Sequence, residues 1–277
     1  MPFLEPLSPI ADQPLSVVLL AHNEAPHLEA VVNDWLTLLD ELGRDHEVLL
    51  VDAGSTDGTL ELAESLATSV GGLQVLRSAG RGHGAALRTA LVLARKPLLF
   101  YTTCDRQYQA AELMLLLAEI DKVHLISGFR RWRPIPVWLR WPGRVYRLAL
   151  RILLGFAPEP LRLWLGWREY LFRMAIRIFF AVRLQDVNCV FRLCRRDIFA
   201  HIPIQSEGDF VHAEVLAKAN FLGCYMSDDI AVTYQPRTED DDQAQRRQRW
   251  KDGYRVLSHP DFGACTAPVA QAEIPQD

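Results

Sequence analysis

Short apolar runs that alternate with helical patterns constrain the fold of this chain more than any other feature. Five such runs are predicted to be strands, at 15–20, 47–51, 73–76, 98–102 and 123–127. A continuous apolar run is typical of a strand buried on both faces, and strands that alternate with helices build βαβ units. The sequence therefore predicts an α/β fold around a mainly parallel sheet flanked by helices.

Polar and acidic side chains follow three of the predicted strands. Asn23 and Glu24 come after the first strand, Asp52 after the second and Asp105 after the fourth. The carboxyl ends of parallel strands meet at one edge of a sheet, so we expect these side chains to share a crevice there. For Asp105 alone, capping of the following helix is an equally open interpretation.

Two glycine-rich loops, at 53–59 and 78–84, follow the second and third predicted strands. Glycine allows the backbone to approach another group closely. Several strand-end acids together with two such loops favour a ligand site at this edge.

Composition excludes several classes of protein. The net charge of −4 gives no overall attraction to nucleic acid, and the five cysteines are odd in number with no Cys-x-x-Cys pair. That pattern favours reduced thiols in the cytoplasm over a disulfide framework or a zinc site. The first residues lack the pattern of a signal peptide, and no apolar run reaches the roughly 18 residues of a spanning helix.

The segment 129–185 has a composition unlike the rest of the chain. It contains twelve arginines, two glutamates and no lysine, a net charge of +10, and five of the seven tryptophans. Arg140, Arg144 and Arg147 lie on one face of a predicted helix, which suits an amphipathic element at a membrane surface. Packing against the domain or a second copy of the chain is the alternative, and nucleic acid is the least favoured partner.

The following stretches carry the motifs of the chain, in order: Ala21–Glu24, Val51–Thr59, Gly82–Leu87, Thr102–Gln107, Asp186–Leu193, Glu214–Ala219 and Tyr234–Arg237. Together they resemble the motifs of family 2 glycosyltransferases of the GT-A fold, and most closely those of the polyprenyl-phosphate, dolichyl-phosphate mannosyltransferase-like branch.

This resemblance implies a site for a nucleoside-diphosphate sugar. The residues at the matching positions that would contact the donor are Asn23, Glu24, Asp52, Gly82, Gly84 and Arg237. The resemblance also implies Mg²⁺ or Mn²⁺ at the diphosphate, held by Asp105 and Gln107, since a hard cation prefers oxygen ligands.

The resemblance further implies an inverting transfer of a hexose to a polyprenyl phosphate or another acceptor at the inner face of the membrane. Asp105 would act at the diphosphate, and Asp209 or Glu214 would be the base that activates the acceptor.

The sequence departs from the family pattern at three positions. Thr103 replaces the first acid of the Asp-x-Asp motif, Ala53 stands where a second Asp is common, and Asn188 replaces an acid. A catalytically degenerate relative that binds a nucleotide sugar, associates with membranes or oligomerises is therefore the alternative function.

The predicted organisation is one GT-A domain at 14–264, which includes the amphipathic helical insertion at 129–185. The stretches 1–13 and 265–277 are predicted to be tails.

Overall fold

The structure is a computed structural model of the chain. It describes residues 9–131, 176–177, 180, 182, 184–235, 251–256, 258–259 and 261. The chain divides into two compact units, one formed by 1–130 with 184–277 and the other by 131–183. The predicted amphipathic helices and Arg237 lie outside the described residues.

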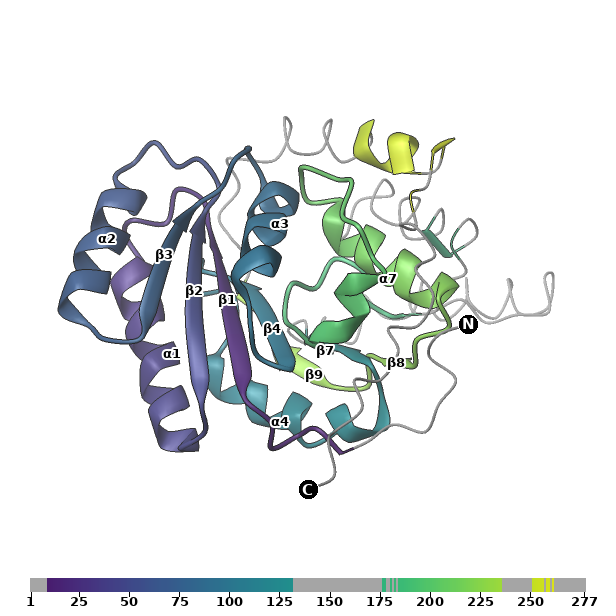
Figure 1. The fold of residues 1–277 in the computed structure, drawn as a ribbon, viewed down its shortest axis with the longest axis horizontal. Helices are drawn as coiled ribbons and strands as arrows, with labels where there is room; N and C mark the ends of the chain where they lie inside the picture. Colours follow the sequence, from purple (N-terminus) through teal and green to yellow (C-terminus); the bar gives the residue numbers. More distant parts are fainter. Residues whose placement is uncertain are drawn as a thin grey trace, which may run out of the picture. The chain divides into compact units, whose positions relative to one another are not determined.

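Seven strands form the main sheet of the first unit, in the order β3-β2-β1-β4-β7-β5-β8 (Figure 1). They are β1 Leu15–Ala21, β2 His46–Asp52, β3 Leu73–Arg77, β4 Leu98–Thr103, β5 Leu125–Ser127, β7 Arg192–Arg195 and β8 Met226–Ser227. Strand β7 runs antiparallel to both of its neighbours, and the other pairs are parallel. The predicted α/β class with a mainly parallel sheet is confirmed, and the antiparallel β7 is an addition.

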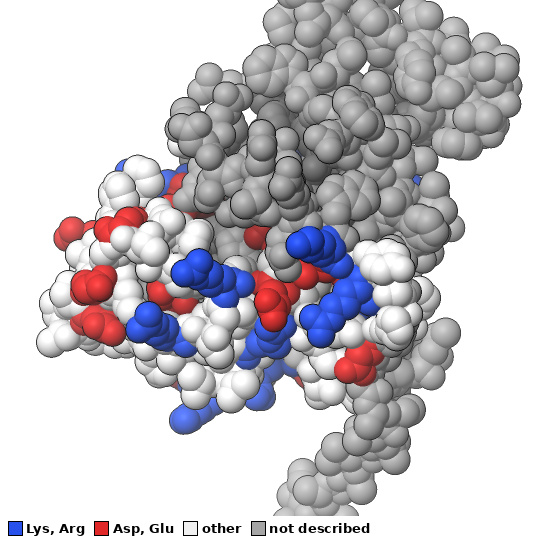
Figure 2. Space-filling view, turned by 90° about the horizontal axis from the view of Figure 1, so that it is seen from above, with Lys and Arg blue, Asp and Glu red and all other residues white. Residues whose placement is uncertain are grey.

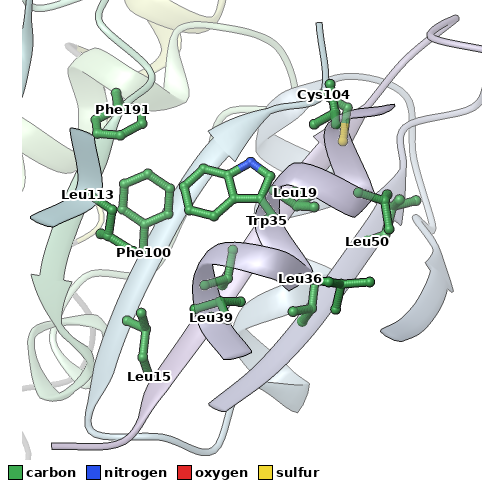
Figure 3. Close-up of a cluster of buried hydrophobic side chains, with 14 of the residues drawn as sticks. Leu15, Leu19, Trp35, Leu36, Leu39, Leu50, Phe100, Cys104, Leu113 and Phe191 are labelled. Carbon is green, nitrogen blue, oxygen red and sulfur yellow. The ribbon is translucent and has the colours of Figure 1, made fainter. Parts of the chain in front are cut away.

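Helices cover both faces of this sheet. Phe100 and Tyr101 are consecutive in β4, so their side chains point to opposite faces. On the Phe100 face, the Trp35 ring of α1 lies 5.0 Å from the Phe100 ring, within a cluster that α2 and α4 also enter (Figure 3). On the Tyr101 face, the ring stacks on His212 of α7. The helix bounds are α1 Leu28–Leu42, α2 Thr59–Ser69, α3 His83–Leu93, α4 Leu113–Leu117 and α7 Val211–Phe221.

The strands could be predicted from apolar runs because most of their residues are buried. Every residue of β1 is buried, and so are the last five residues of β2. The helix predicted at 110–120 is instead a short 3₁₀ turn followed by the five residues of α4. Strands β6 Phe129–Arg131 and β9 Ala231–Thr233 form a separate two-stranded sheet.

Four of the five cysteines lie in the described part of the chain, and their thiols are free and buried. Among the described residues, no helix has the length and apolar character needed to cross a membrane.

Candidate functional site

The carboxyl ends of β1, β2 and β4 meet at one edge of the sheet. Ala21 pairs with Asp52 and Leu20 with Thr103, so the loops after these strands leave the sheet side by side. The strand-end residues predicted from the sequence therefore come together in space. On the described part of the face seen in Figure 2, Lys and Arg side chains lie among Asp and Glu side chains.

Asp52 and Asn23 fasten the loops after β2 and β1 to each other. The Asp52 carboxylate accepts hydrogen bonds from the backbone N–H groups of Gly54 and Ser55, at 3.1 and 3.2 Å. The Asn23 N–H donates to the Ser55 hydroxyl at 2.9 Å, and the Asn23 side-chain oxygen accepts from the Thr56 N–H at 2.9 Å. These hydrogen bonds fix the two loops relative to each other.

Glu24 and Asp57 extend this arrangement. The Glu24 N–H donates to the Thr59 hydroxyl at 2.8 Å, and that hydroxyl donates to Asp57 at 2.5 Å. Partial burial acts to raise the pKa of the Asp57 carboxyl, but hydrogen bonds from Thr59 and from the Ala25 N–H lower it overall. Asp57 thus stays ionised and holds the loop.

Asp105 forms a tight turn after β4. Its Oδ1 accepts a hydrogen bond from the Thr103 hydroxyl at 2.8 Å and from the Gln107 N–H at 3.3 Å. Burial raises the pKa of the Asp105 carboxyl, against the opposing effect of these two hydrogen bonds. The next helical turn begins only at Ala110, after Gln109, so Asp105 is not its cap.

The oxygen atoms at this turn fit a divalent cation that takes only one or two of its ligands from the protein. Among the described residues, no group of three or more His, Cys, Asp or Glu side chains could enclose a metal ion. Mg²⁺, however, is commonly held by one or two carboxylates together with substrate phosphates and water. Asp105 would supply one carboxylate and Gln107 a side-chain amide oxygen, while the Thr103 hydroxyl donates a hydrogen bond that orients Asp105.

Gly82 and Gly84 pack closely against the backbone of residues 206–208. This packing requires glycine at both positions, whereas the sequence suggested a close approach to a ligand. A Cβ on Gly84 would lie 2.1 Å from the Ser206 carbonyl oxygen, and one on Gly82 would lie 2.6 Å from that of Glu207. The Glu207 carbonyl accepts hydrogen bonds from the N–H groups of Gly84 and Ala85 at 2.8 and 3.2 Å. Part of the α3 N-terminus is therefore capped by residues 203–208, here called the brace loop.

Glu214 is buried in α7 and holds the brace loop. Its two carboxylate oxygens accept hydrogen bonds from the Gln205 and Ser206 N–H groups, each at 2.8 Å, and Oε1 lies 2.8 Å from the Lys218 ammonium. Both charged side chains are almost fully excluded from solvent, at 0% and 1% exposed. From the C-terminal segment, Asp252 accepts from the Gly208 N–H at 3.0 Å.

Asp209, the other candidate base, has a more accessible position directly after the brace loop. Its Oδ1 lies 3.1 Å from Nδ1 of His83, and the two side chains are 16% and 21% exposed. The same His83 nitrogen lies 3.3 Å from Nε2 of His212. Asp209 is therefore more accessible than Glu214, and its carboxylate lies beside an imidazole.

Two residues that contact these candidates or their neighbours were not selected from the sequence. His83 lies between the two glycines of the 82–84 motif. A histidine inside a glycine-rich loop was the feature of the sequence that could have identified it. Arg192 is fully buried on β7 and donates hydrogen bonds to the Tyr101 hydroxyl at 3.0 Å and to the His212 carbonyl at 2.5 Å. An arginine inside the apolar run Cys189–Cys194 was the signal there. Burial raises the pKa of Tyr101 to about 12, although the Arg192 charge opposes this.

Sequence comparison gives relatives for this chain. The model of glycosyl transferase family 2 matches residues 16–202. The undecaprenyl-phosphate 4-deoxy-4-formamido-L-arabinose transferase of Pseudomonas aeruginosa is 30% identical over 146 residues, which are 52% of this chain and 43% of that protein. An uncharacterized glycosyltransferase of Mycobacterium tuberculosis is 31% identical over 134 residues, 48% of this chain and 55% of that protein. The chain thus spans less than half the length of the Pseudomonas relative.

Structural comparison agrees at the level of the fold. Glucosyl-3-phosphoglycerate synthase from Mycobacterium tuberculosis, in complex with UDP, superposes with a TM-score of 0.62 over 91% of this chain and 83% of that one, at 20% identity. The same synthase with Mn²⁺ and UDP-glucose gives a TM-score of 0.60 over 90% of this chain and 79% of that one. These matches describe the architecture as GT-A-like. Since the family model also covers most of the chain, this protein belongs to glycosyl transferase family 2.

Proposed function

We propose that this protein transfers a sugar from a nucleoside-diphosphate sugar to an acceptor, with polyprenyl phosphate as the first acceptor to test. One observation carries the proposal: the loop after β1 with Asn23, the loop after β2 with Asp52 and the Asp105 turn after β4 meet at one edge of the sheet. Relatives that are named for transfer to undecaprenyl phosphate support the choice of acceptor.

The donor would extend along this edge from the loops after β1 and β2 to the turn after β4. The loops that contain Asn23, Glu24 and Asp52 would hold the nucleoside. Glu24 and Asp52 are themselves buried, and the Asp52 carboxylate orders its loop by accepting hydrogen bonds from two N–H groups. The diphosphate would lie toward Asp105 and Gln107, which would hold Mg²⁺ or Mn²⁺. When bound, such a cation neutralises negative charge on the diphosphate. Solved neighbours that contain Mn²⁺ or Mg²⁺ with UDP support this arrangement.

The proposed reaction is an in-line displacement at the anomeric carbon. The acceptor oxygen forms the new bond to this carbon while the bond to the diphosphate oxygen breaks, and its electron pair leaves with the nucleoside diphosphate. Inversion follows from attack on the opposite face. A phosphate acceptor is already ionised, whereas a hydroxyl acceptor would give up its proton to Asp209.

The membrane surface is the proposed place of reaction. A lipid-linked acceptor requires access to a membrane, and the net charge of +10 over 129–185 would attract anionic lipids. A second copy of the chain as the partner of 129–185 remains the competing proposal.

Calorimetry with UDP- and GDP-sugars, with and without Mn²⁺, tests the donor site, and a transfer assay with polyprenyl phosphate tests the reaction. We expect metal-dependent binding that Asp105→Ala weakens and Asp45→Ala preserves, because Asp45 forms an exposed ion pair with Lys96. Absence of binding to every donor would contradict the proposal. Binding without transfer to any acceptor would instead support the catalytically degenerate relative.

A further inference from the structure

A buried ion pair joins two segments that are far apart in the sequence. The Arg130 guanidinium donates from Nε and Nη2 to the two oxygens of Asp186, at 2.6 and 2.8 Å, and the Arg130 backbone N–H donates to the same carboxylate at 3.2 Å. The side chains are only 14% and 9% exposed. A two-pronged contact between arginine and a carboxylate fixes orientation as well as distance.

Arg130 contacts one segment that supports the Asp105 turn, residues 234–235, and Asp186 begins the other, residues 186–191. On the Arg130 side, the guanidinium lies 5.0 Å from the centre of the Tyr234 ring, and the next residue, Gln235, donates its N–H to the Gln107 carbonyl at 3.0 Å. The Tyr234 ring also lies 5.7 Å from the ring of Tyr108.

On the Asp186 side, the chain turns and residues 190–191 contact Tyr108 as well. The Asp186 carbonyl accepts from the Cys189 N–H at 3.3 Å, and the Val190 N–H then donates to the Tyr108 hydroxyl at 3.3 Å. The Phe191 ring lies 5.5 Å from the Tyr108 ring. Tyr108 is therefore held between two segments.

The C-terminal half of the turn depends on these two supports. Gln107 and Tyr108 contact residues 190–191 and 234–235, and the Gln107 N–H in turn donates to Asp105. We infer that Arg130 and Asp186 are positioning residues, which hold the two supports together and so set the placement of Asp105 and Gln107 for the metal-bound diphosphate. This inference rests on the proposed function. It assigns a role at the donor site to a pair that does not itself touch the donor.

Asp186→Asn tests the inference, with UDP and Mn²⁺ as probes in the full-length chain. Residues that orient metal ligands typically change metal affinity by about 10- to 100-fold when replaced. We expect the apparent affinity for Mn²⁺ in the presence of UDP to fall by roughly this factor, with UDP binding in the absence of metal unchanged. A purely structural role would lower both together or neither. Arg130→Lys keeps the charge but loses the two-pronged contact, and it should give the same selective loss.

Tyr108→Phe provides a milder variant if removal of the ion pair prevents folding. It deletes only the hydroxyl that accepts from Val190, and we expect a smaller loss of the same kind. Asp45→Asn is the matched control, because it removes an exposed ion pair and should bind as the wild type does. Wild-type protein that binds no UDP with Mn²⁺ would overturn the proposed function. Wild-type binding together with unchanged Mn²⁺ affinity in Asp186→Asn, Arg130→Lys and Tyr108→Phe would overturn the positioning role alone.

Discussion

Replacement of Glu214 by Gln distinguishes a structural carboxylate from a catalytic one. The substitution keeps the size of the side chain but leaves one acceptor oxygen for the two N–H groups of Gln205 and Ser206. It also removes the counter-charge of the buried Lys218 ammonium. Breaking one partner of a buried ion pair costs about 3–5 kcal/mol. We therefore expect the free energy of unfolding to fall by several kcal/mol.

Thermal and denaturant unfolding measure this loss directly. For a chain of this size, the expected change corresponds to a fall in Tm of roughly 10 °C. Glu207→Gln is the matched control, because this exposed acid lies in the same brace loop and contributes its backbone carbonyl, which the variant retains. The double variant Glu214→Leu/Lys218→Met should recover part of the stability, since it removes both buried charges together.

The alternative role of Glu214 makes the opposite prediction. Loss of a general base lowers the rate of transfer by about 100- to 10,000-fold without a matching loss of stability. An unchanged Tm together with a rate reduced to this degree would refute the assignment of Glu214 to the brace loop. A reduced Tm with near-normal kcat in the folded fraction is the expected result.

Three further predictions follow from the described contacts. Gly84→Ala should destabilise the protein by about 1–3 kcal/mol in denaturant unfolding, because its Cβ would lie 2.1 Å from the Ser206 carbonyl oxygen, whereas Gly71→Ala has open space and should not. Burial raises the pKa of the Cys104 thiol, so mass spectrometry should find it unmodified by iodoacetamide in native protein and modified in urea. Burial and the Arg195 charge lower the pKa of His124, so the unfolded chain binds a proton there at higher pH than the folded chain does. The stability that neutral His124 contributes is therefore complete above a pH of about 6.5 and is lost as the pH falls below it. His124→Gln should flatten this part of the pH–stability curve.

The sequence by itself determined the mainly parallel α/β architecture and the edge of the sheet at which the candidate residues meet. Runs such as 15–20 and 98–102 are mostly apolar because parallel strands are buried on both faces, so both the strands and their carboxyl ends could be identified. Parallel pairing then required Asn23, Asp52 and Asp105 to share an edge, and the registers confirm that it does. These inferences depended only on local pattern and on the geometry common to all parallel sheets.

Only the tertiary structure decided what individual side chains contact. Glu214 and Asp209 are both acids near the start of one helix, and sequence spacing could not distinguish them. The fold buries Glu214 against Gln205, Ser206 and Lys218, while Asp209 lies beside His83 from a segment more than a hundred residues away. Arg130 and Asp186 likewise meet across 56 residues of chain. Such contacts depend on long-range packing, which local periodicity does not encode, and for that reason the partners of these charged residues became visible only in the folded chain.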